Sequence, residues 1–284
     1  MNSIHEILIS CIYSFRKRLT DLRFYIVLSV TAILMVILTD TMKDFVLNAQ
    51  SNINILEPFL LEFQNDAVMT ILYLGLIMIF TDAPFFDEKD SYFAVRIQRI
   101  NWFLGKCIYV VFMTVLYILF LELISILCIL PVGYIGNMWS EAIYLLSTTN
   151  AAVVEGVPLV YSTNVIWALT MNGAAFHNFF LSVLGGIFLG MLFYLLSIKT
   201  NKVFGIISVS AIFFSGKVII WTQSRELFKV AFYNIVNLTK HDFGLDSSLP
   251  TLSWSYMILA ILNAILILSI VCSSRKDIKM GQIE

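Results

Sequence analysis

Two ionisable residues stand inside long apolar runs of this 284-residue chain. Glu122 lies sixteen residues after Lys106, and Lys217 lies fifteen residues after Lys202. If both runs are helices entering a membrane from the same side, a rise of about 1.5 Å per residue places both charges roughly 23 Å deep. An unpaired charge at that depth costs at least a few kcal/mol. We therefore predict a Glu122–Lys217 pair that lines or gates a translocation path across the membrane. Alternatively, Lys217 reaches the outer interface and Glu122 faces the outer loops.

The other patterns that could support catalysis are incomplete. His5-Glu6 lacks the second histidine of a metalloprotease helix, and Gly105-Lys106 lacks the glycine-rich approach of a phosphate-binding loop. A GxSxG motif is absent, and the four cysteines have no CxxC spacing. We expect no enzymatic activity, no metal and no cofactor in this chain.

The composition is that of an all-α polytopic membrane protein. The chain is 59% apolar and 13% charged, against roughly 25% charged residues in an ordinary soluble domain. A membrane-spanning helix needs about 20 residues, and snorkelling or boundary polar residues can extend a slightly short run. We predict six spans, at Phe24–Thr39, Ala67–Thr81, Cys107–Leu130, Asn178–Ile198, Val203–Trp221 and Trp254–Cys272.

The distribution of basic residues predicts the orientation. Lys and Arg are retained on the cytoplasmic side of a bilayer, and an inside N-terminus places thirteen of the eighteen there. We expect one domain, 1–284, in the cell membrane, with both termini cytoplasmic. The segments 131–177 and 222–253 would then face outward, although the second carries three basic residues against the rule.

Residues 1–23 have the pattern of an amphipathic interfacial helix. Apolar residues recur at helical spacing from Ile4 to Leu22, and basic residues gather at the end that meets the membrane. We expect this helix to lie along the inner leaflet with its basic residues near anionic headgroups. The pattern also fits a generic membrane-surface helix.

Residues 82–106 form a charged island between two apolar runs. Aromatic and charged side chains alternate there, as suits docking onto a soluble partner, although the basic residues also fit simple topological anchors. We expect Trp102 to lie in the interfacial aromatic belt. The candidate partner-binding residues are Phe85, Phe86, Tyr92, Phe93, Arg96 and Arg99.

The order Arg96, Arg99, Trp102, Gly105, Lys106 before a long apolar run resembles the cytoplasmic loop of type-2 ATP-binding-cassette (ABC) permeases. The amphipathic entry helix, the six spans and the inside termini extend this resemblance over nearly the whole chain. It implies a permease subunit that exports a peptide, lipid-linked or other amphipathic substrate, with ATP bound by a separate ABC ATPase. The long cation-free segment 131–177 departs from the family pattern.

The resemblance also implies that the chain pairs with a second copy or a homologous permease in the lipid bilayer; nucleic acid is not expected as a partner. Gly186 and Gly190 form a GxxxG, which allows close helix contact, and packing within the chain is favoured over a dimer seam. Two other functions stay open: a stand-alone secondary transporter or channel, and a non-transporting scaffold or immunity protein.

Overall fold

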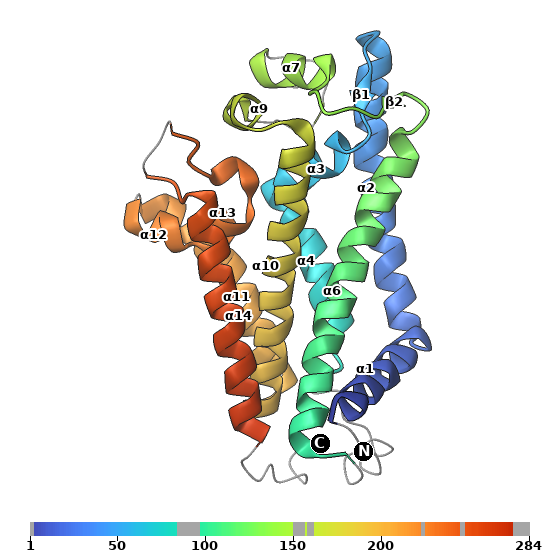
Figure 1. The fold of residues 1–284 in the computed structure, drawn as a ribbon. Helices are drawn as coiled ribbons and strands as arrows, with labels where there is room; N and C mark the ends of the chain where they lie inside the picture. Colours follow the sequence, from blue (N-terminus) through green and yellow to red (C-terminus); the bar gives the residue numbers. More distant parts are fainter. Residues whose placement is uncertain are drawn as a thin grey trace.

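The computed structural model describes residues 3–83, 97–149, 157, 162–222, 225–244 and 248–274. Within these ranges the chain folds as a bundle of long helices with one short parallel strand pair (Figure 1). Four helices are long and apolar enough to cross a membrane. They are α2 (Leu22–Asn48), α6 (Arg99–Ile129), α10 (Met171–Lys199) and α14 (Leu252–Ser274).

Each predicted apolar run coincides with a helix to within one residue, and several of the helices extend well past the runs. The run predicted from Asn178 belongs to a helix that begins at Met171, and the run predicted to end at Thr39 belongs to one that continues to Asn48. Hydropathy marks the part of a helix that lipid covers, whereas capping groups mark where it ends. The Thr170 hydroxyl, for example, accepts a hydrogen bond from the Gly173 N–H at the start of α10.

The second predicted span is a helix pair with a sharp bend. α3 (Glu57–Gln64) and α4 (Asp66–Phe80) meet at 92°, and only together do they pass as a fifth spanning unit. Asn65 lies at the corner, and its side chain caps α4 by accepting from the N–H groups of Ala67 and Val68. α3 therefore runs across the bundle, and the fifteen-residue α4 runs along it (Figure 1).

The fifth predicted span is α11 (Lys202–Thr222), which packs against α10. The described side chains of α11 show an apolar stretch at Lys202–Ile212; those of residues 213, 214, 217, 218 and 220–222 lie outside the description. The described residues thus show a mainly helical chain with four helices long and apolar enough to span a membrane, or five if the bent pair is one span.

α10 lies at the centre of the bundle and packs against α4, α6, α11 and α14. Its glycines permit these close contacts. A Cβ on Gly186 would lie 2.6 Å from Thr114, and one on Gly190 would lie 2.7 Å from Val110. Both glycines thus face neighbouring helices of the same chain.

The end of the bundle opposite α1 (Ser3–Leu19) carries a cap of short elements, which we name the cap (Figure 1). Its strands pair in parallel, Ile53 with Gly133 and Asn54 with Tyr134. Its helices pack against this end of the bundle, and Trp139 Nε1 donates a hydrogen bond to the Leu169 carbonyl at 2.8 Å. The cap comprises β1 (Ile53–Asn54), β2 (Gly133–Tyr134), α7 (Glu141–Thr148) and α9 (Thr163–Ala168).

Three short elements connect α11 to α14 beside the cap, namely α12 (Arg225–Val230), α13 (Phe232–Val236) and η1 (Leu238–Lys240). The Asn237 side chain joins them to the α3–α4 corner by donating to the Gln64 carbonyl at 2.8 Å. Gln64 in turn donates to Asn178 of α10 at 2.5 Å. This buried polar network fixes the bend against α10.

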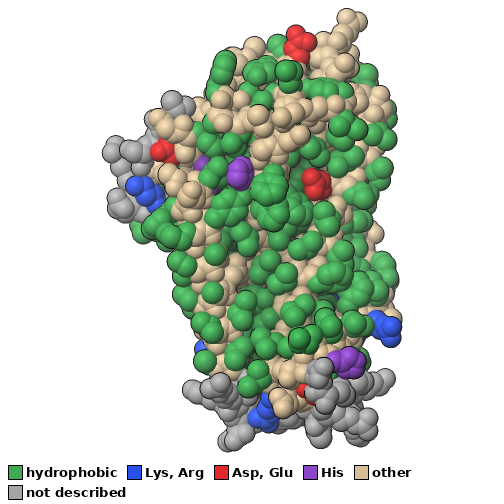
Figure 2. Space-filling view, in the orientation of Figure 1, with side chains coloured by type: hydrophobic (Ala, Val, Ile, Leu, Met, Phe, Trp, Pro, Cys, Tyr) green, Lys and Arg blue, Asp and Glu red, His purple; other side chains and the backbone are tan. Residues whose placement is uncertain are grey.

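The exterior supports placement in a membrane. Figure 2 shows hydrophobic side chains over the length of the visible face, with few Lys and Arg side chains visible: most lie in its lower part and one lies on the bulge at the left. Many large apolar side chains of the long helices are exposed, such as Ile33, Leu123 and Leu268, each more than half exposed. Such a surface is unusual for a soluble protein and suits contact with lipid.

Candidate functional site

The contact between α1 and the first turns of α6 joins charged and polar side chains of the two helices. Every fourth side chain of α1 faces α6 and is buried, because residues four apart share a helix face. These four side chains are polar: Glu6, Ser10, Ser14 and Arg18. The outward face of α1 is apolar, with Ile4, Leu8 and Ile12 about half exposed or more.

This arrangement refines the expected amphipathic helix. The apolar face is free to contact lipid, as predicted, but the polar stripe faces the protein. Arg18, which was expected near lipid headgroups, is 4% exposed. α1 is therefore anchored to the bundle through hydrogen bonds and ion pairs, whereas a generic surface helix would present its polar side to water.

Glu6 joins the start of α1 to the start of α6. Its carboxylate accepts from Asn101 Nδ2 at 2.8 Å and from the Gln98 N–H at 3.3 Å. The hydrogen bond from Asn101, assisted by the one from Gln98, lowers the pKa of Glu6 below its usual value although burial opposes this. The carboxylate is therefore ionised at neutral pH and satisfies an otherwise open N–H at the start of α6.

Gly105 permits the close approach of the two helices. A Cβ at this position would lie 2.5 Å from the Ser10 Cβ and 2.7 Å from the Ile7 carbonyl oxygen. The Ser10 hydroxyl uses this proximity to donate to the Trp102 carbonyl at 3.2 Å. Glycine at position 105 is thus a packing requirement of the α1–α6 contact.

Lys106 is buried in this contact, with 1% of its surface exposed. Its Nζ donates to the Ser14 hydroxyl at 2.7 Å and lies 4.1 Å from the centre of the Trp102 ring. The prediction that Trp102 lies in the interfacial belt is wrong, because this side chain is 1% exposed. Its indole ring packs against the Lys106 ammonium. This contact depends on α1, which covers both residues.

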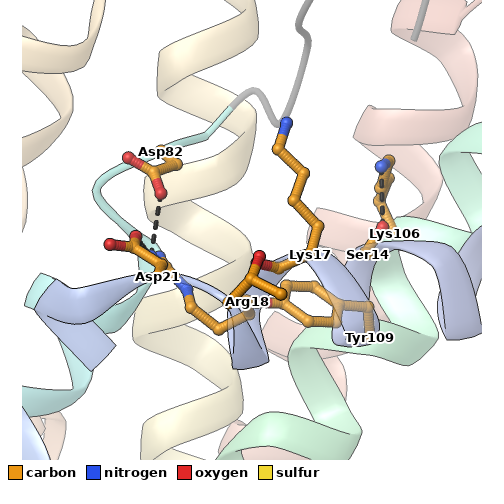
Figure 3. A pocket seen from close by; sticks show the side chains of 8 residues that line it. Ser14, Lys17, Arg18, Asp21, Asp82, Lys106 and Tyr109 are labelled. Carbon is orange, nitrogen blue, oxygen red and sulfur yellow. Dashed lines mark hydrogen bonds and ion pairs between the residues drawn. The ribbon is translucent and has the colours of Figure 1, made fainter. Parts of the chain in front are cut away.

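Arg18 links three segments of the chain (Figure 3). Its Nη1 lies 2.6 Å from a carboxylate oxygen of Asp21, at the start of α2, and 2.8 Å from one of Asp82, just after α4. Exposed Arg23 adds a longer contact to Asp82 at 3.5 Å. Burial opposes ionisation of Asp21, but the Arg23 N–H and the Arg18 guanidinium together lower its pKa.

The structure describes only part of the predicted partner-binding set. Arg99 is exposed at the first residue of α6. The remaining candidates, Phe85, Phe86, Tyr92, Phe93 and Arg96, lie outside the described residues. The described flanks of the island, Asp82 and Gln98, both bond to α1.

The predicted intramembrane pair remains a prediction. Glu122 is half-buried on α6, and Lys217 lies on α11 with its side chain outside the description. Both helices pack against α10. The two helices therefore share α10 as a neighbour. A contact between the two charges lies outside the described residues.

Sequence reasoning missed Glu6, Ser10, Ser14, Asp21 and Asp82 as members of this site. A signal was present, since a polar residue recurs at every fourth position from Glu6 to Arg18. The apolar residues of the same segment carried a stronger pattern, and nothing local indicates that the polar side of a helix faces α6.

A second buried polar cluster lies toward the cap. Glu57 accepts from the Asn54 N–H at 2.9 Å and from the Ser140 N–H at 2.7 Å, and so ties β1 to the start of α7. Glu62, fully buried, accepts from the Thr39 hydroxyl at 2.6 Å.

Within the described part of the chain, His, Cys, Asp and Glu side chains form no group of three that could hold a metal ion. The described groups instead make hydrogen bonds and ion pairs that join helices. Comparisons with protein-family models, curated proteins and solved structures found no match to this chain.

Proposed function

We propose that this chain is the membrane-spanning permease subunit of an ABC exporter, driven by a separate ATPase that docks on the island 82–106. The observation that carries the proposal is the attachment of α1 to both flanks of that island. Arg18 binds Asp82 on one flank, and Glu6 binds Gln98 and Asn101 on the other. A partner that moves the island also moves α1.

The attachment offers a route for force into the bundle. Charge-assisted hydrogen bonds and a close glycine contact hold α1 and the first turns of α6 as one rigid unit. α6 has 31 residues, so at a rise of about 1.5 Å per residue it extends roughly 46 Å. A tilt at its first turns therefore reaches the cap.

The positions of the first and last helices support the same proposal. The start of α1 and the end of α14 lie at one end of the bundle, opposite the cap (Figure 1). The described basic residues of α1 and the described Lys199 and Lys202 between α10 and α11 belong to this end. Because Lys and Arg are retained on the inner side of a membrane, we propose that this end is cytoplasmic, where an ATPase can bind.

The test is co-purification with an ATPase in mild detergent. We expect Phe86→Asp combined with Tyr92→Asp to abolish recovery of the ATPase, because loss of an aromatic anchor typically costs about 2 kcal/mol at an interface. Trp167→Asp, a change of an exposed aromatic residue in the cap, serves as the matched control. Equal recovery of the ATPase with both variants contradicts the proposal.

A stand-alone secondary transporter is the second candidate, and the buried carboxylate of Glu62 favours it. Glu62 is a fully buried carboxylate that accepts from the Thr39 hydroxyl, and carboxylates inside a membrane bundle are typical members of proton pathways. This candidate requires uptake or efflux in vesicles that contain only this chain, driven by a pH gradient and lost in Glu62→Gln. Transport that needs ATP and the partner excludes it.

A further inference from the structure

A pocket of about 220 Å³ lies where the end of α1 meets the start of α2, the end of α4 and α6 (Figure 3). All of its charged lining residues come from the end of the bundle that carries α1. The described charged residues that line it are Lys17, Arg18, Asp21, Asp82 and Lys106.

Arg18 has an unused donor in this pocket. Its Nη1 is held by Asp21 and Asp82, and the Tyr109 hydroxyl also interacts with the guanidinium. Its Nη2 is buried and makes no hydrogen bond of good geometry with the described residues. A buried guanidinium nitrogen normally has an acceptor, because leaving it unpaired costs free energy. Nη2 can therefore take an acceptor that enters the pocket.

The charge around this donor favours an anion. Among the described residues that line the pocket, three are cations, Lys17, Arg18 and Lys106, and two are carboxylates, both of which bind Nη1 of Arg18. Burial holds the Lys106 ammonium in place beneath α1. A metal cation is disfavoured, because it would have to displace the Arg18 guanidinium from both carboxylates.

A phosphate group matches this chemistry best. The planar guanidinium fork suits phosphate oxygens, and lysine ammonium groups bind phosphate as point charges. The pocket has about seven times the 30 Å³ that one water molecule occupies in the liquid, which leaves room for the ester substituents of a phosphate. Leu19 and Leu22, both exposed beside it, are placed to contact the acyl chains of a lipid.

We infer that this pocket binds a phosphate ester, in the headgroup of an anionic phospholipid or in a soluble molecule. Binding would bridge the end of α1 to α6 and so stabilise the contact described above. The inference does not depend on an ATPase partner, since only residues of this chain form the pocket.

The test uses the purified full chain in a zwitterionic detergent, with thermal unfolding as the readout. Three additions are compared: phosphatidylglycerol, phosphatidylcholine and soluble glycerol phosphate. We expect phosphatidylglycerol to raise the unfolding temperature and phosphatidylcholine to have no such effect. Stabilisation by glycerol phosphate as well identifies the free phosphate ester as a sufficient ligand; stabilisation by the lipid alone identifies the headgroup.

Variants locate the effect in the pocket. Lys17→Gln should weaken phosphatidylglycerol binding about tenfold, as expected for the loss of one charge-assisted contact. Arg16→Gln removes the same charge from the exposed side of α1 and should bind like the unaltered chain. Arg18→Gln should abolish binding, and Lys17→Gln keeps the test decisive if Arg18→Gln fails to fold.

Two results overturn the inference. One is equal stabilisation by phosphatidylglycerol and phosphatidylcholine without any effect of glycerol phosphate. The other is an equal loss of binding in Lys17→Gln and Arg16→Gln, because binding would then follow the net charge of α1 rather than the pocket.

Discussion

Gly105 carries the closest helix contact of the candidate site, and it provides the clearest prediction for a single residue. Gly105→Ala places a methyl group 2.5 Å from the Ser10 Cβ and 2.7 Å from a backbone oxygen of α1. Since backbone cannot move aside as a flexible side chain can, we expect a destabilisation of about 1–3 kcal/mol. Thermal unfolding and protease sensitivity at the α1–α2 junction measure it.

Gly173→Ala is the matched control for this prediction. It lies in the first turn of α10, where the nearest atom to an added Cβ is the Thr170 hydroxyl oxygen at 3.2 Å. We expect a much smaller change there. Equal effects of the two substitutions would mean that helix propensity, which favours alanine over glycine, outweighs the packing of α1.

The role that the sequence suggests for Lys106 differs from the role that it has in the structure. As a basic residue between two apolar runs it reads as a topological anchor, yet it is 1% exposed and bonded to Ser14. A buried ammonium is tolerated only with a hydrogen-bond partner and a favourable charge environment. α1 supplies the hydroxyl, and the Trp102 ring supplies its π face.

At the scale of elements, the attachment of the cap depends on Glu57. Its carboxylate accepts from the Asn54 N–H and the Ser140 N–H and so ties β1 to the start of α7. Glu57→Ala removes the acceptor of both hydrogen bonds, so we expect the free energy of unfolding to fall by about 1–3 kcal/mol.

This prediction is measured by thermal unfolding of the purified chain. Glu141→Ala, in the first turn of α7, removes an exposed carboxyl and serves as the control, for which we expect a much smaller effect. An equal effect of the two substitutions would contradict the role of Glu57 in holding the cap.

Two further elements, α6 and α11, carry the predicted Glu122–Lys217 pair. If the charges pair, Glu122→Gln and Lys217→Met should each impair assembly or transport, because each leaves a charge without its partner. The double variant should recover part of the loss. A double-mutant cycle on protein yield and transport measures the coupling, and strictly additive effects would show that the two residues do not interact.

At the scale of the whole molecule, the open question is which end faces the cytoplasm. We predict that the end carrying α1 is inside and the cap is outside, with loop positions such as Asp90 and the tail at Lys279, both beyond the described residues, also inside. In a background without native cysteines, a membrane-impermeant reagent added from outside should label a cysteine at Thr149 of the cap. It should miss one at Thr20; both positions are exposed.

The reverse labelling pattern would remove the basis for an ATPase at the α1 end. Lysing the cells first provides the control, since both cysteines should then react. The result therefore decides the orientation and bears directly on the proposed function.

Several features of this protein follow from the sequence alone. Long uncharged runs predict helices that cross a membrane, because hydrocarbon forces the backbone to satisfy its own hydrogen bonds. Apolar spacing predicts α1 as an amphipathic helix, and the island 82–106 stands out by its charge. These properties are local or compositional, so a single chain reveals them.

Tertiary structure alone decided how these elements meet. No local pattern shows that Gly105 faces Ser10, that Arg18 reaches Asp82 across 64 positions, or that the chain turns by 92° at Asn65. Such contacts depend on which helices pack together, and many pairings satisfy the same hydrophobic pattern. Close packing and the pairing of buried charges select among them, and both become visible only when distant segments are in place.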